Sequence, residues 1–209
     1  MSREIQVRFC EHLEGRFLRV TRRNVYVGSV KAGQRVMELL RKSYAGLKLQ
    51  INEAKSAVAS AFGRKFLGFA LWAGKGKEVK CKVAKKPLQN FKARIRQLTR
   101  RSGGRSMEQV VEKLRPYLLG WKAYFVLAQT PGVWRELDKW LRHRLRAIQL
   151  KHWKLPKTIY RELKALGADE DVAARVAAYS RRWWRNSAML LNSVLTIDYF
   201  DRMGVPRLS

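Results

Sequence analysis

Positive charge restricts the folds and partners open to this chain more than any other property of its sequence. Its 209 residues include 45 Lys and Arg against 16 Asp and Glu, a formal net charge of +29. Self-repulsion of this size destabilises a compact state unless a polyanion neutralises it, which points to nucleic acid or an anionic membrane surface. Because 46% of the residues are hydrophobic and 11% are aromatic, a packed core is expected and a disordered basic tail is excluded.

The sequence shows no sign of a membrane span, a secretory leader or a zinc site. No apolar run is long enough to cross a bilayer, and the amino-terminal segment MSREIQVRFCEHLEG lacks the apolar stretch of a signal peptide. Cys10 and Cys81, with three histidines, do not form the paired spacings of a structural zinc site. We therefore expect a cytoplasmic protein with reduced cysteines, no bound metal and no membrane partner.

Residues 16–83 combine short β-type runs with one helical pattern. Phe17–Val20 and Asn24–Val27 are predicted as the two strands of a hairpin, with Thr21-Arg22-Arg23 at its turn. A helix is expected between a cap at Ser29 and a stop at Gly46. Two further strands are predicted, at Leu47–Ile51 and at Val79–Val83. Phe66–Trp72 is predicted to be either a buried strand or a sharp turn.

From Pro87 onward the pattern is helical. Ser106 and Gln109 have the spacing of a capping box at the start of a helix. Pro116 predicts a kink or a break in that helix, because proline removes a hydrogen bond from the helix interior. Later helices are expected to begin at Thr130-Pro131 and at Asp169.

The basic residues are concentrated in this helical half. Between Lys85 and Lys157 there are 19 Lys and Arg against 4 Asp and Glu, interleaved with aromatic residues. A single cation in such a run is more often part of a solvated face than a ligand contact. The shortage of acidic residues across the whole segment, however, favours a surface that binds nucleic acid.

Several motifs follow one another in the order seen in a known family. They are LKLQINEAKS (47–56), KFLGF (65–69), an arginine-rich helix end (96–101), LGWKAYF (119–125), LDKWLR (137–142), WKLPKT (153–158), WRNS (184–187) and YFDRMG (199–204). As an ordered set, they resemble the carboxyl-terminal part of group II intron-encoded reverse transcriptase/maturases. The resemblance extends from about Arg16 to the end of the chain.

The resemblance implies a fold and a domain order. The implied class is α+β, in which a partial reverse-transcriptase palm of short antiparallel strands and a helix precedes a mostly α-helical thumb and maturase domain. By this alignment, residues 1–84 are the partial palm and residues 85–155 are the thumb with the maturase-specific region. Residues 156–209 are then the carboxyl-terminal part of maturase domain X.

The catalytic motif of the family is altered here. Its hairpin pattern, F-V-R-Y-A-D-D-x-N-h-Y-V with h apolar, corresponds to FLRVTRRNVYV at residues 17–27. Arg22 and Arg23 stand where the resemblance places the two carboxylates that bind Mg²⁺, and cations repel such an ion. The resemblance therefore implies a protein without a catalytic residue, without the family's Mg²⁺ cofactor and without polymerase activity.

The resemblance also implies that the thumb and domain X bind group II intron RNA and assist its splicing, with DNA or an RNA–DNA duplex as further partners. By position, we expect one set of cations to contact phosphates: Arg94, Arg96, Arg100, Arg101, Lys122, Arg142, Arg144, Arg146, Lys151 and Lys154. Other motif residues are expected to have structural roles: Asn52, Lys55, Gly68, Gly120, Trp121, Tyr124 and Trp140. Of Trp183 and Trp184, one is expected in the core and one on the surface.

Three other interpretations stay open at this point. The chain could be half of a split reverse transcriptase, although Arg22 and Arg23 then require a partner that supplies its own metal site. It could be a degenerate remnant of a mobile element that binds nucleic acid without specificity. It could also be a basic protein that binds nucleic acid or membranes and is unrelated to introns, although ordered motifs are not needed for that. No endonuclease is expected, because no Cys and His cluster follows the maturase motifs.

Overall fold

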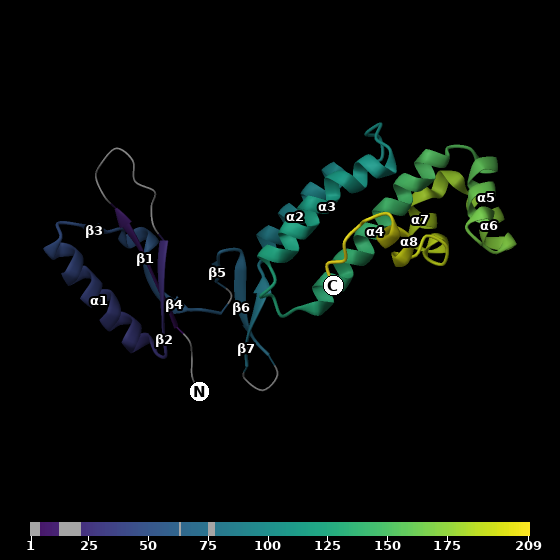
Figure 1. Cartoon of the computed structure of the whole chain (residues 1–209). Coiled ribbons are helices and arrows are strands. Elements are labelled where there is room, and N and C mark those ends of the chain that lie inside the picture. Colours follow the sequence, from purple (N-terminus) through teal and green to yellow (C-terminus); the bar gives the residue numbers. More distant parts are fainter. Residues whose placement is uncertain (1–4, 13–21, 63, 75–77) are drawn as a thin grey trace. The chain divides into compact units, whose positions relative to one another are not determined.

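The computed structural model describes residues 5–12, 22–62, 64–74 and 78–209. The chain divides into two compact units, Met1–Lys82 and Val83–Ser209. The first combines short strands with one long helix, whereas the second consists of helices (Figure 1). The predicted class, α+β with a helical carboxyl-terminal part, is therefore confirmed. No helix among the described residues is both long and apolar enough to cross a bilayer.

An antiparallel sheet forms the centre of the first unit. Strand β1 (Ile5–His12) pairs along one edge with β2 (Arg22–Val27). Its other edge pairs with β3 (Gln50–Ile51) and with β4 (Ala57–Ser60). Because all three partners bond to β1, this strand holds together segments that lie far apart in the sequence.

Helix α1 (Val30–Gly46) packs against this sheet. Ser29 caps it as predicted, since its hydroxyl accepts a hydrogen bond from the N–H of Ala32 at 3.1 Å. The helix ends at Gly46, also as predicted. Met37 is buried against a ring of partly buried side chains: Val25, Val27, Leu40, Tyr44, Ile51 and Val58.

The hairpin turn predicted at Thr21-Arg22-Arg23 is wrong for Arg22 and Arg23. Arg22 and Arg23 lie inside β2, opposite Cys10 and Phe9 of β1. The other predicted strand, Phe17–Val20, falls outside the described residues. Strand β1 was not among the predicted strands, although Ile5, Val7 and Phe9 alternate with Gln6 and Arg8 as in a half-buried strand.

The strand predicted over Leu47–Ile51 is largely wrong. Only Gln50–Ile51 is extended, because the N–H groups of Leu47, Lys48 and Leu49 all bond back to carbonyls of Tyr44 or Ala45. Lys48 takes the left-handed conformation with a φ of 55°. Alternating residues in this segment therefore reflect a tight helix end and not a half-buried strand.

A second small sheet contains β5 (Lys65–Phe66), β6 (Phe69–Ala73) and β7 (Val79–Val83), in that order. Phe66 pairs with Phe69, so Leu67 and Gly68 form a two-residue hairpin loop. Their φ values of 47° and 82° are the positive angles that such a loop requires. Of the two alternatives for this segment, the sharp turn is confirmed at Leu67-Gly68, and glycine is needed there.

The second unit is built from α-helices joined by short connections. The first three are α2 (Lys85–Leu98), α3 (Met107–Tyr124) and α4 (Pro131–Trp153). They are followed by α5 (Pro156–Ala165), α6 (Glu170–Ala178), α7 (Trp183–Ala188) and α8 (Ile197–Arg202). Helix α4 is the longest of these, and Figure 1 shows α5 and α6 packed side by side near one of its ends.

Helix α3 confirms one prediction and excludes one of the two alternatives given for Pro116. Ser106 and Gln109 form the predicted capping box, with reciprocal side-chain bonds of 3.1 and 3.3 Å. Pro116 does not split the helix, which is continuous from Met107 to Tyr124. Because Pro116 is exposed, water can bond the carbonyl that the missing N–H leaves free.

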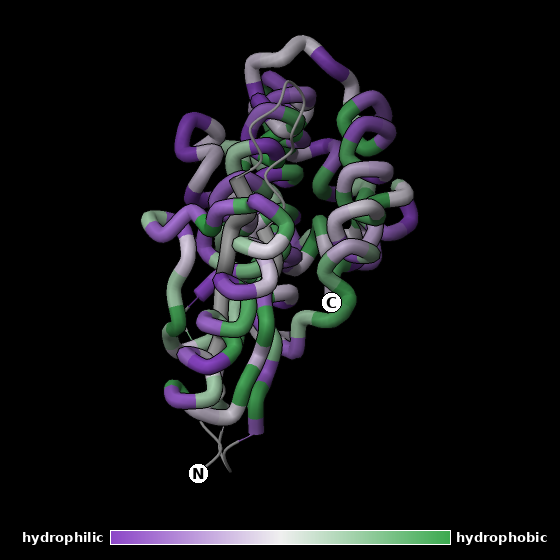
Figure 2. The backbone as a smooth tube through the Cα atoms, turned by 90° about the vertical axis from the view of Figure 1, so that its left-hand side faces the viewer, coloured by the Kyte–Doolittle hydropathy of each residue, from purple (hydrophilic) through white to green (hydrophobic). Residues whose placement is uncertain are grey.

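The core of the second unit lies along α4. Leu141 and Leu145 are fully buried there, as are Phe91 of α2 and Leu114 of α3. Figure 2 shows apolar and polar segments alternating along the helices, the pattern of helices with one buried and one solvated face. This core fixes the backbone from which the basic side chains project.

Candidate nucleic-acid interface

Helix α2 presents basic side chains because its apolar residues face inward. Phe91, Ile95 and Leu98 are buried, which places Arg94 and Arg96 on the exposed side. Arg94 donates to the side chain of Gln97 at 3.1 Å and makes no ion pair among the described residues. The helix therefore presents cations that no carboxylate in the described part of the chain neutralises.

Three cations surround the ring of Trp140 on α4. The Lys92 ammonium lies 5.9 Å from the ring centroid, and the guanidinium carbons of Arg96 and Arg144 each lie 5.5 Å from it. The face of an indole attracts cations, so the ring partly offsets their mutual repulsion. Trp140, expected to be structural, thus organises positive charge at the surface of α2 and α4.

Arg144 is tied to the end of α2. Its Nε donates to the hydroxyl of Thr99 at 2.6 Å, and its Nη2 donates to the Thr99 carbonyl at 3.2 Å. Burial and then the nearby charge of Arg96 lower the pKa of Arg144. A phosphate can therefore contact only those guanidinium N–H groups of Arg144 that Thr99 does not use.

Arg101 is similarly anchored. Its Nε donates to the carbonyl of Ala147 at 3.2 Å, and its guanidinium carbon lies 4.4 Å from the ring centroid of Trp183. Burial lowers the pKa of this group. Its position is thus set by α4 and α7, and it still lines the groove described next.

We call the hollow between the α2–α3 turn and the end of α4 the basic groove; its cations are Arg101, Arg105, Lys151 and Lys154. The hollow measures about 800 Å³, and among the described residues that line it Glu108 is the one acid. His152 ties its two walls together, since its Nε2 donates to the carbonyl of Arg105 at 2.9 Å. Four cations against one carboxylate suit a polyanionic ligand.

The backbone at Lys154 is strained. This residue follows α4 with a φ of 55° and a ψ of −68°, and the N–H of Leu155 donates to the carbonyl of Trp153 at 2.7 Å. A three-residue turn of this sense is rare for a residue with a side chain. Strain of this kind concentrates at binding sites, and here it occurs at a lysine that lines the basic groove.

Two of the expected phosphate contacts are wrong. Arg142 has an exposure of 0% and Arg146 one of 6%, so neither faces solvent. Both point inward because they hold other parts of the fold. Arg146 donates from its Nε to the carbonyl of Leu195 at 2.7 Å, and burial, followed by the charge of Arg142, lowers its pKa to about 10.

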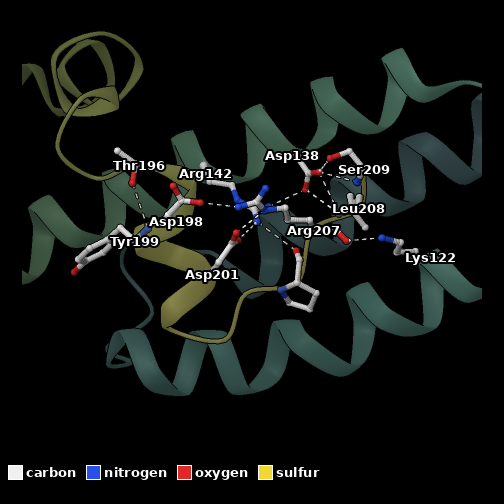
Figure 3. A network of polar contacts seen from close by, with 11 residues as sticks. Lys122, Asp138, Arg142, Thr196, Asp198, Tyr199, Asp201, Arg207, Leu208 and Ser209 are labelled. Atoms are coloured by element: carbon white, nitrogen blue, oxygen red, sulfur yellow. Dashed lines mark hydrogen bonds and ion pairs between the residues drawn. The ribbon is translucent and has the colours of Figure 1, made fainter.

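Arg142 is the centre of a buried ionic network (Figure 3). It donates to Asp138, one turn earlier on α4, at 2.7 Å and to Asp201 of α8 at 3.0 Å. Asp138 also accepts the backbone N–H groups of Leu208 and Ser209, at 3.1 and 2.9 Å. Arg142 and Asp138 therefore fasten α8 and the last residues of the chain to α4.

The other expected RNA contacts are spread over the surface. Arg100, Lys151 and Lys154 are exposed. Lys122 is exposed as well, but its ammonium donates to the carbonyl of Arg207 at 3.0 Å (Figure 3). The structure thus gathers Arg101, Lys151 and Lys154 in one groove and leaves Lys122 apart from them.

The motif residues of the first unit have identifiable structural positions. Asn52 caps a short 3-10 helix, Glu53–Lys55, by accepting the N–H of Lys55 at 3.2 Å. This bond accounts for the asparagine at position 52, whereas it uses only the backbone of Lys55. Gly68 supplies the positive φ of the β5–β6 hairpin. Of Arg22 and Arg23, only the backbone position in β2 is described.

The motif residues of α3 differ in burial. Trp121 packs among three aromatic rings, with centroid distances of 4.2 Å to Phe91, 4.8 Å to Phe125 and 5.1 Å to Trp134. Tyr124, three residues later, is mostly exposed. Gly120 has open space where a side chain would be, so no close packing requires glycine there.

Sequence reasoning missed several residues of this surface. Neither Arg105 nor Lys92 belongs to the set of RNA contacts expected from the sequence. Both positions were visible in the sequence as cations beside predicted apolar faces. What was missing was the tertiary pairing that brings Arg105 next to Lys151.

Comparison with known proteins bears on this same helical region. Residues 88–167 match the sequence model of one family, described as "Group II intron, maturase-specific domain". The matched segment includes all of α3, α4 and α5 and every cation of the basic groove. No curated protein matches the chain.

Proposed function

We propose that this chain, whose residues 88–167 match the model of the group II intron maturase-specific domain, binds group II intron RNA and assists its splicing. The intron performs the splicing chemistry in such systems. The protein's part is to stabilise the folded RNA, which requires contacts to closely spaced phosphates. No step of the reaction is assigned to a side chain of this chain.

The observation that carries this proposal is the basic groove inside the matched segment. Arg101, Arg105, Lys151 and Lys154 line it with Glu108 as the sole acid. One of these cations, Arg101, is held by a part-buried hydrogen bond to the carbonyl of Ala147, and another, Lys154, lies at a strained backbone turn. Cations held in place lose little freedom when a phosphate binds, so they favour a ligand of defined shape.

Polymerase activity is not part of the proposal. Arg22 and Arg23 occupy the positions that the family resemblance assigns to the metal-binding carboxylates. A guanidinium does not ligate Mg²⁺ and repels it. DNA and RNA–DNA duplexes remain secondary partners in the proposal, because phosphate contacts alone do not distinguish them from RNA.

The proposal is tested by binding the purified chain to its cognate intron RNA and to an unrelated RNA of equal length across a salt series. We expect a preference for the intron that survives high salt, followed by faster or more complete splicing of that intron in the presence of the protein. Binding that is equal for both RNAs and falls steeply with salt would reduce the chain to a non-specific basic protein.

Substitutions in the groove sharpen the same test. Replacing Arg105, Lys151 and Lys154 by Gln should weaken intron binding by about 10- to 100-fold at low salt and reduce the slope of log K against log salt by about 2. The matched control removes the same charge where each cation already has a surface carboxylate partner: Lys139→Gln, Arg161→Gln and Lys164→Gln. Equal losses in both triple variants would rule out the groove as the binding site.

A further inference from the structure

A second basic and aromatic surface lies beyond the matched segment, between α6 and α7. It surrounds a hollow of about 350 Å³, which we call the aromatic pocket. Tyr179, Arg182, Arg185, Asn186 and Met189 are among its lining residues. None of them belongs to the set of expected RNA contacts.

The charge at this pocket is not balanced within the described part of the chain. Arg182 and Arg185 are exposed and make no ion pair with any described residue. Arg175 has a partner, Asp171, at 3.5 Å, but both side chains are well exposed. The pocket therefore favours an anionic ligand, as the basic groove does.

An exposed aromatic ring distinguishes this pocket from the groove. Tyr179 has an exposure of 53%, and the guanidinium carbon of Arg182 lies 5.2 Å from its ring centroid. Three hydrogen bonds fix the backbone of Tyr179. Its N–H donates to the Arg175 carbonyl at 3.0 Å. Its carbonyl accepts from the N–H of Arg182 at 2.8 Å and from Nδ2 of Asn186 at 2.9 Å. A ring exposed on so fixed a backbone is a ready stacking surface.

Asn186 adds a polar group to the pocket. Its exposure is 4%, and its Nδ2 is used for the carbonyls of Tyr179 and Val176, at 2.9 and 3.5 Å. No donor among the described residues bonds its Oδ1. This oxygen is not among the buried side-chain atoms that lack a partner, so it stays available as an acceptor for a ligand, and the exocyclic amine of a base is a suitable donor for it.

We infer that the aromatic pocket binds one unpaired base of RNA, stacked on Tyr179, with Arg182 and Arg185 on the flanking phosphates. Met189 supplies an apolar contact for the base, and Asn186 supplies an acceptor for its edge. An acidic peptide would use the arginines but would leave the ring of Tyr179 without a stacking partner. This inference rests on the proposed function in taking RNA as the polyanion.

The test uses the whole chain and a short single-stranded RNA that carries one 2-aminopurine, a base whose fluorescence is quenched by stacking. Wild-type protein should quench it, and Tyr179→Leu should weaken binding by about tenfold, the usual loss for one base–aromatic stack. Tyr179→Phe keeps the ring and should retain both binding and quenching. A fully paired RNA hairpin of equal nucleotide number should bind all three proteins alike.

Two control variants separate stacking from charge and from folding. Arg182→Gln with Arg185→Gln should weaken single-strand binding more than Arg161→Gln with Lys164→Gln, which removes the same charge from α5, where both cations are paired with carboxylates. Tyr124→Leu removes another mostly exposed tyrosine and should leave binding unchanged. Unchanged circular dichroism and melting temperature show that Tyr179→Leu is folded, as its exposure predicts.

The outcomes distinguish this inference from the proposed function. If Tyr179→Leu binds and quenches like wild type while intron RNA is still preferred, the pocket inference fails and the proposed function stands. If stacking on Tyr179 is confirmed but intron RNA is not preferred, the pocket inference stands and the proposed function fails. Competition by polyglutamate that equals competition by single-stranded RNA, and that weakens equally in Tyr179→Leu, would assign the pocket to an acidic peptide and overturn the inference.

Discussion

The two units of this chain differ in what holds them together. In the second unit, apolar side chains such as Phe91, Leu141 and Leu145 are completely buried. In the described part of the first unit, the buried apolar side chains are Met37, Ala61 and Ala70. The first unit depends mainly on strand pairing around β1, whereas the second has a dense interior of its own.

The same contrast holds for their ion pairs. Arg142 and Asp138 of the second unit are buried and join segments distant in sequence. Arg41 and Glu53 of the first unit form a bidentate ion pair, in which the Nε–Oε1 and Nη2–Oε2 distances are both 2.9 Å. Both of these side chains, however, are about half exposed. Both proposed RNA-binding sites lie in the second unit, whose dense interior fixes the helices that carry their cations.

The largest expected effect comes from breaking the buried pair. Arg142→Leu leaves the buried carboxylate of Asp138 without a cation, while Asp201 keeps Arg207, and should lower the free energy of unfolding by about 3 to 5 kcal/mol. Arg41→Leu, the matched change in the first unit, should leave it unchanged within error, because solvent screens that pair. Denaturant unfolding followed by circular dichroism measures both. Equal effects would show that the two pairs do not differ in this way.

A somewhat smaller difference is expected when apolar side chains are truncated. Leu145→Ala should cost about 2 to 5 kcal/mol, because the surrounding core cannot close the cavity. Met37→Ala should cost less, since its neighbours are only partly buried and can move inward. The measurement is again denaturant unfolding, with Leu39→Ala on the exposed side of α1 as control. A larger loss for Met37→Ala than for Leu145→Ala would reverse the comparison.

The smallest expected effect is a gain in the first unit. Leu67 has a φ of 47°, a conformation that a leucine adopts only at a cost, and its side chain is exposed. Leu67→Asn should stabilise the β5–β6 hairpin by about 1 kcal/mol, because asparagine tolerates positive φ. Hydrogen exchange at Phe69 and Ala70 reports on this hairpin directly. Faster exchange in the variant would mean that Leu67 is needed for packing.

Much of the helical fold was predictable from local signals. The capping box at Ser106, the helix start at Pro131 and the helix stop at Gly46 all depend on neighbours within a few residues, and all are confirmed. Strands were harder to predict because their partners lie elsewhere in the chain. Without knowledge of the pairing between β1 and β2, Arg22 and Arg23 were assigned to a turn.

The candidate site was likewise predictable only in part. The excess of positive charge between Lys85 and Lys157 required only counting, and it indicated nucleic acid before any fold was known. Which cations are free was not visible, because helical periodicity alone does not show that Arg142 meets Asp201 from another helix. The unpaired arginines beside Tyr179 were likewise missed, since their neighbours come from two different helices.

By itself, the sequence determined the charge, the helical caps and the ordered motifs, because each is a property of single residues or short spacings. Only the tertiary structure decided which arginines stabilise the interior and which remain free for a ligand. The physical reason is desolvation. A guanidinium taken out of water must find carboxylates or carbonyls within hydrogen-bonding distance, and the packing of α4 against α8 supplies them to Arg142 while leaving Arg105 and Arg182 at the surface.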